Sequence, residues 1–174
     1  MKRLIFSFVL FGIISLVFTN NSFAQDQTFS DANVEYTFDL PEPTWKMVIK
    51  PSPSNPNVEF AYGDRLDGHL EIRKISVKET DALSDLIRND QEQKLQFLPG
   101  FVAGKEEVFS GNLKGKVFNY EYVRSGKPMS GRFYYLKSDA TTLYIVRFTG
   151  LRDKLRLIRN QVDSIARTFK LKSA

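Results

Sequence analysis

The sequence contains no cysteine and a single histidine, His69. The lack of cysteine excludes disulfides, thiolate metal ligands, a cysteine nucleophile and the acylated cysteine that anchors an outer-membrane lipoprotein. One histidine argues against a zinc site or a mechanism that needs a histidine pair. The longest apolar run, Leu4 to Phe18, is also shorter than the roughly 20 residues that span a bilayer comfortably.

The amino terminus has the three parts of a signal peptide. Lys2 and Arg3 supply a positive start, the run to Phe18 carries no charge, and Ser22-Phe23-Ala24 places small residues at a cleavage site. We therefore expect a signal peptide over residues 1–24, cleaved after Ala24. An uncleaved anchor is the alternative, but the run is short for it. The expected product is exported, periplasmic or extracellular, and has no integral membrane segment.

The rest of the chain has the size and the charge balance of one ordinary domain. Without Lys2 and Arg3, 23 basic residues face 20 acidic ones, which is too even for nucleic-acid binding. No repeat or low-complexity tract divides it. We expect a flexible lead over residues 25–32 and a single α+β domain over residues 33–172.

Alternating apolar and polar residues predict a strand-rich chain with two helices. Thr80 or Asp81 is expected to cap the first helix, which reaches Leu98 and is exposed over residues 89–94 because its apolar stripe is thin there. Leu155, Ile158, Val162 and Ile165 predict a closing helix over residues 151–168. The expected strands cover residues 34–40, 45–49, 58–62, 70–77, 101–109, 116–124, 131–137 and 141–149.

The last two expected strands are apolar on both faces. Tyr134 and Leu136 alternate with Phe133 and Tyr135, so both faces need cover. With two helices available, we predict a three-layer α/β/α sandwich, a mostly antiparallel sheet with one helix on each face. The residues expected to be buried in it include Trp45, Phe148, Ile158, Ile165 and Phe169.

Three segments of the sequence resemble the PsbP-like superfamily. They are the pattern Tyr36-Thr-Phe38-Asp-Leu40-Pro41, the following Trp45, and the ending Ser164-Ile-Ala-Arg-Thr-Phe169. The similarity covers most of residues 33–171. The superfamily includes photosystem II extrinsic subunits, a nuclear-import factor that binds Ran, and DcrB-like bacterial envelope proteins, and it implies the α/β/α sandwich. Because the matching residues are apolar scaffold positions, the resemblance implies no catalytic residue, cofactor or partner motif.

The densest polar cluster is Asp64, Asp67, His69 and Glu71, in a glycine-flanked turn that leads into a strand. One interpretation is a hard-cation site, since calcium takes several oxygen ligands from acidic loops. The spacing matches no EF-hand loop, however, and Asp and Gly are ordinary turn residues. We favour the turn and expect no metal, cofactor or catalytic residue.

Other candidate motifs have simpler explanations. Gly111 to Lys116 lacks the length and the hydroxyl residue of a phosphate-binding loop, and a hairpin explains it better. Ser125 and Lys127 lie in a turn, where a solvated lysine stays charged and cannot act as a base. The cationic helix face of Arg152, Arg156, Arg159 and Arg167 is either a lipid- or partner-binding surface or simply a solvated face, and we favour the second.

Two functional hypotheses remain open. The first is an exported, non-catalytic binding or accessory protein of the bacterial cell envelope, and under this hypothesis its partner is another envelope protein. Its preferred contact region is the loop over residues 50–57, stiffened by three prolines, although that loop is equally well a plain connector. The alternative is a small-ligand carrier or an enzyme with a pocket between the sheet and the first helix.

Overall fold

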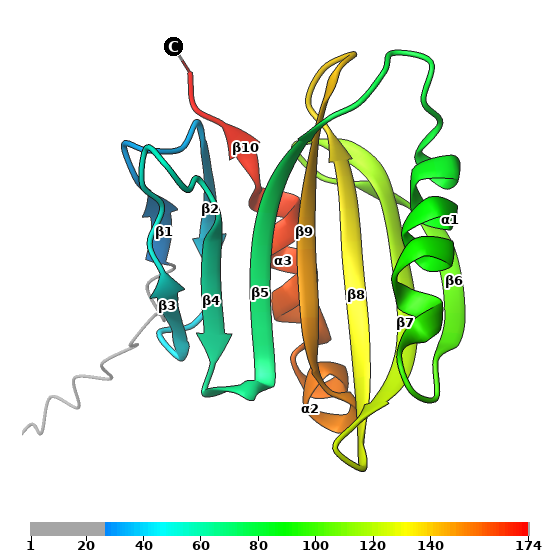
Figure 1. Ribbon diagram of the computed structural model, residues 1–174. Coiled ribbons are helices and arrows are strands. Elements are labelled where there is room, and N and C mark those ends of the chain that lie inside the picture. Colours follow the sequence, from blue (N-terminus) through cyan, green and yellow to red (C-terminus); the bar gives the residue numbers. More distant parts are fainter. Residues whose placement is uncertain (1–26, 174) are drawn as a thin grey trace, which may run out of the picture.

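The computed structural model describes residues 27–173, which fold into an α+β structure dominated by antiparallel strands (Figure 1). The predicted cleavage site at Ala24 lies outside the described residues. The strands are β1 (Gln27–Ser30), β2 (Tyr36–Leu40), β3 (Trp45–Ile49), β4 (Val58–Tyr62), β5 (Asp64–Ser76), β6 (Val102–Ser110), β7 (Lys114–Arg124), β8 (Lys127–Lys137), β9 (Thr142–Leu151) and β10 (Lys170–Leu171). The helices are α1 (Leu83–Gln93), the 3-10 turn η1 (Leu95–Phe97), α2 (Arg152–Leu157) and α3 (Arg159–Thr168).

Seven strands form one large antiparallel sheet in the order β3-β4-β5-β9-β8-β7-β6. Its centre is built from the strands that the sequence predicts as apolar on both faces. Tyr134 on β8 pairs with Val146 on β9 and Val117 on β7, and all three are buried. Because β3 and β6 are the edges of this sheet, each leaves a row of backbone groups unpaired by it.

A second sheet joins the two ends of the described chain and was not predicted. Its order is β1-β2-β10, so β2 belongs to this small sheet and not to the large one. The predicted flexible lead over residues 25–32 needs correction as well, because Gln27–Ser30 form β1 and pair with β2. Phe29 explains the ordering, since its ring is buried and stacks on Phe38 with centroids 4.8 Å apart.

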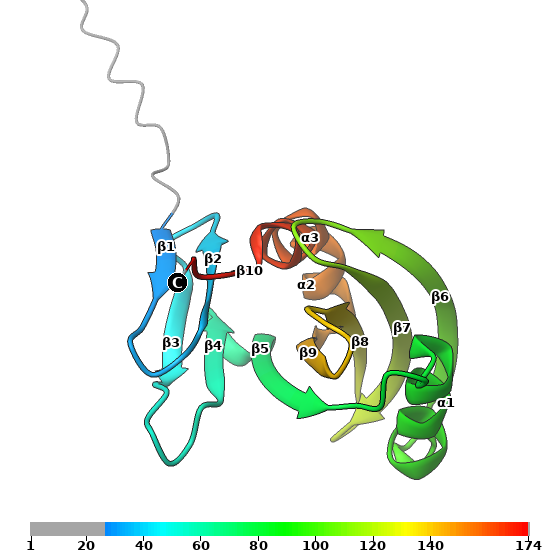
Figure 2. The ribbon, with the colours of Figure 1, turned by 90° about the horizontal axis from the view of Figure 1, so that it is seen from above.

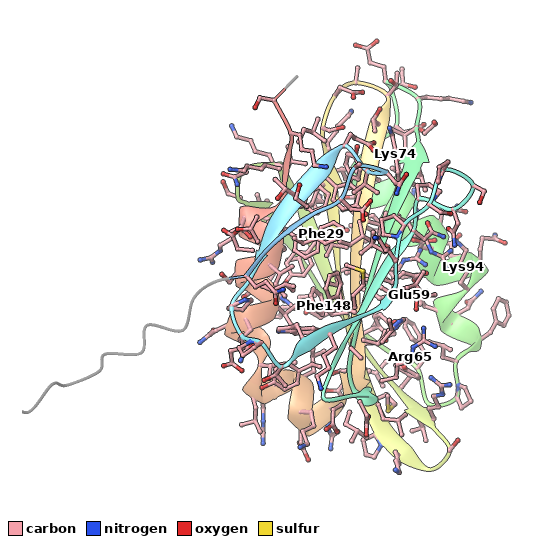
Figure 3. All side chains as sticks on the ribbon, turned by 90° about the vertical axis from the view of Figure 1, so that its left-hand side faces the viewer. Phe29, Glu59, Arg65, Lys74, Lys94 and Phe148 are labelled. Atoms are coloured by element: carbon pink, nitrogen blue, oxygen red, sulfur yellow. The ribbon has the colours of Figure 1, made fainter. Side chains whose placement is uncertain are left out.

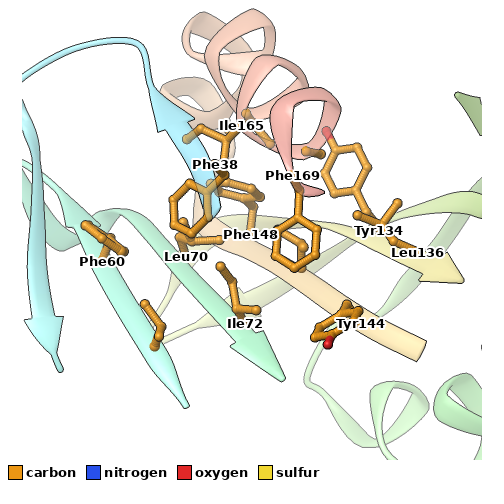
Figure 4. Close-up of a cluster of buried hydrophobic side chains, with 14 of the residues drawn as sticks. Phe38, Phe60, Leu70, Ile72, Tyr134, Leu136, Tyr144, Phe148, Ile165 and Phe169 are labelled. Carbon is orange, nitrogen blue, oxygen red and sulfur yellow. The ribbon is translucent and has the colours of Figure 1, made fainter. Parts of the chain in front are cut away.

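Two hydrophobic cores lie on opposite faces of the large sheet. Figure 2 shows the helices that cover these faces, α2 and α3 on one side and α1 on the other. The larger core joins the small sheet and the closing helices to the sheet, and Phe38, Phe148, Ile165 and Phe169 meet there (Figure 4). The smaller core lies under α1 and η1, around Ile87. All five residues predicted to be buried are buried, namely Trp45, Phe148, Ile158, Ile165 and Phe169.

The helices differ from prediction in number and in their ends. The expected closing helix is two helices, α2 and α3, which meet at Ile158, so the predicted single helix on each face is not found. Neither predicted cap caps α1, which begins after Ala82 without a side-chain cap. Asp81 instead accepts a hydrogen bond from the backbone of Lys78 at 2.8 Å. None of the described helices has the length and hydropathy needed to cross a bilayer.

Candidate functional site

The predicted acidic cluster begins at Asp64, which has the structural role of a turn residue. Its Oδ1 accepts the backbone N–H groups of Leu66 at 2.6 Å and Asp67 at 2.9 Å. These two hydrogen bonds lower the pKa of the Asp64 carboxyl below its usual value. The carboxylate is therefore occupied by the backbone of its own turn.

The other cluster residues have separate partners. Asp67 lies 3.8 Å from Lys154 on α2, whereas His69 Nε2 lies 2.8 Å from Glu59 on the neighbouring strand β4. Glu59 also pairs with Arg65, and Figure 3 shows this pair on the side of the molecule nearest β3 and β4. Over residues 27–173, no group of three or more histidine and acidic side chains is arranged to hold a metal ion.

Glu71 belongs to a charged network between β5, β9 and α1. Arg147 on β9 lies 3.9 Å from Glu71 and 3.5 Å from Asp90 on α1. Tyr135 donates its hydroxyl to Asp90 at 2.9 Å, and Lys94 lies 2.7 Å from the same carboxylate. The segment over residues 89–94 is mostly exposed, as expected, but Asp90 within it is buried. The network fastens α1 to the sheet.

A groove lies on the other face of the sheet, between α2 and the strands β6, β7 and β8. Its volume is about 760 Å³. Arg132 and Asn119 lie at its base, and we name it the α2 groove. Its remaining lining residues are Val102, Ala103, Gly104, Lys105, Glu107, Tyr120, Glu121, Ser130, Gly131, Arg152, Asp153, Leu155, Arg156 and Arg159.

Arg132 is the buried charge at the base of the α2 groove. Its Nε donates to Asp163 on α3 at 2.8 Å and to the Tyr134 hydroxyl at 2.7 Å, while Nη1 donates to Asn119 at 2.6 Å. Burial opposes the charged form, but Tyr134 and Asp163 favour it more strongly, so the pKa of Arg132 is raised. Nη2 makes no hydrogen bond within residues 27–173, which leaves its two N–H groups for a ligand.

Cations also line the walls of the α2 groove. Arg152, Arg156 and Arg159 are exposed there, and they are three of the four residues of the predicted cationic helix face. Arg152 lies 3.4 Å from Glu121, but both side chains are about half exposed, so the pair stabilises little. Guanidinium groups at the base and along the helical wall of the groove suit a carboxylate or another anion, and they outnumber the lining carboxylates of Glu107, Glu121 and Asp153.

A smaller, mostly apolar pocket of about 480 Å³ lies between η1 and the end of β7. Its walls include Leu95, Leu98, Tyr122 and Val123. We name it the η1 pocket. It lies beyond the carboxyl end of α1, and none of its lining residues belongs to the segment over residues 89–94, where the sequence suggested room for a pocket. It has few polar groups to orient a reacting substrate.

The segment Gly111 to Lys116 proves to be a structural turn. A side chain at Gly111 would lie 2.7 Å from the Arg167 backbone, which explains why glycine is needed. Asn112 donates hydrogen bonds from its backbone to the carbonyl of Arg167 and from its side chain to that of Thr168, both at 3.0 Å. These bonds satisfy carbonyl groups at the carboxyl end of α3.

The solved structures show that the fold is a known one, although no family model and no curated protein matches the sequence. Cyanobacterial PsbP from Synechocystis has a TM-score of 0.55 at 16% identity and covers 88% of this chain and 96% of its own. LpqN of Mycobacterium tuberculosis, which is involved in cell envelope biogenesis, has a TM-score of 0.54 at 15% identity, with coverages of 86% and 92%. A Pseudomonas aeruginosa protein of unknown function gives 0.55 at 12%, with coverages of 86% and 99%. These likenesses show a PsbP-like fold.

Proposed function

We propose that this protein is an exported accessory protein of the bacterial cell envelope, within the DcrB-like branch of the PsbP-like proteins, and that it works by binding. The α2 groove is its binding site, and an acidic segment of another envelope protein is its partner. The observation that carries this proposal is the fixed guanidinium of Arg132, whose unused nitrogen lies at the base of a groove with further arginines.

Two further features support binding over catalysis. His69 is the only histidine and pairs with Glu59, away from the α2 groove. The groove therefore pairs no hydroxyl nucleophile with a histidine base. LpqN, which shares the fold, is involved in cell envelope biogenesis, and such a role fits an exported binding protein.

The test removes groove charge without touching the buried Arg132. In the double variant Arg156→Glu with Arg159→Glu, two exposed wall residues repel an acidic partner. Arg167→Glu with Lys170→Glu is the matched control, because it reverses two exposed cations that do not line the groove. We expect the parent and the control to recover the same envelope protein from native extracts after cross-linking, and the groove variant to lose it. Equal recovery by all three would refute the groove as the binding site.

A second candidate function is supported by the η1 pocket. Its apolar walls suit a small apolar ligand, which would make the protein a carrier. Leu98→Trp would fill the pocket. We expect that variant to abolish binding of an apolar fluorescent dye if the carrier function is correct, whereas the α2 groove variants would leave dye binding unchanged.

A further inference from the structure

One end of the molecule combines exposed apolar side chains with unpaired cations. This hairpin end consists of the β7–β8 turn (residues 124–127), η1, α2 and the β4–β5 turn, and it lies at the bottom of Figure 1. The η1 pocket joins two of these parts, since Leu95 and Leu98 face Val123 and Arg124 across it. A backbone hydrogen bond also connects the segment after η1 to β7, because the N–H group of Val123 donates to the carbonyl of Pro99 at 2.7 Å.

The hairpin end carries most of the large apolar side chains that are exposed in the described chain. Phe97 on η1 is 73% exposed and Leu157 at the end of α2 is 77% exposed. Val102, Val123 and Leu66 are exposed at the same end. A single exposed apolar residue is ordinary, but a group of them at one end of a fold marks an interaction surface.

The charges at the hairpin end favour an anionic partner. Arg124 and Lys127 face each other across the β7–β8 turn, and neither has a carboxylate oxygen within 4.0 Å among residues 27–173. Two nearby carboxylates pair with other cations, Glu121 with Arg152 and Asp67 with Lys154. Asp64 accepts backbone N–H groups and lies near enough to Lys127 for that charge to lower its pKa, but it forms no ion pair within 4.0 Å in the described part of the chain. Arg124 and Lys127 can therefore meet negative groups outside the protein.

We propose that the hairpin end docks on a membrane surface rich in anionic phospholipid. Phe97 and its apolar neighbours enter the boundary between head groups and acyl chains, while Arg124 and Lys127 contact the phosphates. A peripheral contact of this kind needs no membrane-spanning helix, and none is present in residues 27–173. A lipid surface is favoured over a protein partner because the apolar residues lie on separate segments of the chain. A fluid lipid surface can adapt to such an arrangement, whereas a protein surface would have to match it in shape.

Strands β7 and β8 supply a control variant with the same change in net charge. Arg124 pairs with Lys127 at the hairpin end of β7 and β8, and Lys114 pairs with Lys137 at the opposite end of the same two strands. Removing either pair lowers the net charge of the protein equally. Only the first pair lies at the proposed membrane contact.

The experiment measures binding to vesicles by sedimentation. It uses the chain from Gln25, because residues 27–173 contain both sheets and both cores, whereas residues 1–24 are apolar enough to bind vesicles themselves. The vesicles contain phosphatidylglycerol with phosphatidylcholine, or phosphatidylcholine alone. We expect binding to the anionic vesicles only. Arg124→Gln with Lys127→Gln should weaken it by roughly ten- to thirty-fold, at about five-fold for each charge.

The control variants decide whether the contact is specific to this end. Lys114→Gln with Lys137→Gln should bind as the parent does. Phe97→Ala should weaken binding about ten-fold, because the ring no longer enters the interface. Val108→Ala, which alters an 85% exposed side chain at the far end of β6, should have no effect. Circular dichroism melting confirms that each variant is folded.

Three results would overturn the proposal. They are failure of the parent to bind anionic vesicles, equally tight binding to vesicles of phosphatidylcholine alone, and equal losses from the two charge variants. The last result would mean that only the overall basic charge attracts the lipid. Although α2 borders both surfaces, these outcomes can be told apart from those of the groove test. The vesicle variants change Phe97, Arg124 and Lys127, none of which lines the α2 groove, and the groove test measures recovery of a protein partner.

Discussion

Arg132 on β8 and Asp163 on α3 form a salt bridge of 2.8 Å, with only 7% and 18% of their side chains exposed. The Tyr134 hydroxyl donates to the same carboxylate oxygen and also accepts from Arg132. This charged contact ties the closing helix to the centre of the sheet. Removing one partner leaves the other buried without its counter-charge.

Asp163→Asn should therefore destabilise the protein by about 2–4 kcal/mol, as expected when one partner of a largely buried ion pair is lost. Urea unfolding followed by fluorescence measures the change. Asp153→Asn is the matched control, because Asp153 and Arg156 are each 77% exposed and such pairs contribute little. The control should change stability by less than about 0.5 kcal/mol. Equal effects of the two variants would show that the Arg132–Asp163 pair does not hold the helix.

Ile165→Ala should cost about 2–5 kcal/mol, the usual range for a large-to-small change in a packed core. Ile165 is fully buried on α3, beside the small sheet. The exposed Arg167 on the same helix provides the comparison, since Arg167→Ala should shift stability by less than about 0.5 kcal/mol. If Ile165→Ala melts with the parent, α3 does not pack against the sheet as described.

Glu35 should make stability depend on acid pH. Burial opposes its ionised form, but Lys74 and Tyr144, each 2.5 Å from Oε1, outweigh burial and lower its pKa. Because the folded pKa lies below the ordinary 4.5, the contribution of Glu35 is present above that pH and is lost as pH falls through the lowered value. The stability difference between the parent and Glu35→Gln should therefore be constant above pH 4.5 and shrink below it. A difference that stays constant into strong acid would contradict this assignment.

His69→Ala with Glu71→Ala should leave function in the host intact, because both side chains have structural partners.

Shortening the loop over residues 50–57, which is closed by backbone hydrogen bonds between Ser52 and Asn55, tests the preferred contact region independently. The measurements are host phenotype and partner recovery, with melting temperature as the control for folding. Loss of function in the first variant at unchanged stability, with a normal loop variant, would revive a metal or catalytic site.

The protein isolated from its native host should begin at Gln25. The physical basis is the combination of a positive start, a short apolar run and the small residues Ser22 and Ala24. Intact-mass measurement decides it. A mass that retains residues 1–24 would contradict the cleavage and leave an anchored chain.

Strands could be predicted from the alternation of apolar and polar residues along the sequence. Features that depend on contacts between residues far apart in the sequence could not. Tyr134 and Val146 lie in strands recognisable from their own neighbours. Asp90, in contrast, is buried because Tyr135 and Arg147 reach it from positions 45 and 57 residues away. The α2 groove likewise depends on where a short helix crosses three strands, so the sequence indicated its arginines but not the buried Arg132 between them.

The small sheet β1-β2-β10 has a consequence for how the chain reaches its final form. Asp39 bonds to Thr168 and Lys172 to Asp31, contacts that span 129 and 141 residues. A chain emerges from a ribosome or a translocation pore with its amino terminus first. The residues of β1 and β2 are therefore available to fold long before those of β10. The chain's last contacts form only after the final residues arrive, and contacts of such long range fold slowly. The small sheet can therefore be completed only after Lys170 and Leu171 become available to pair with β2.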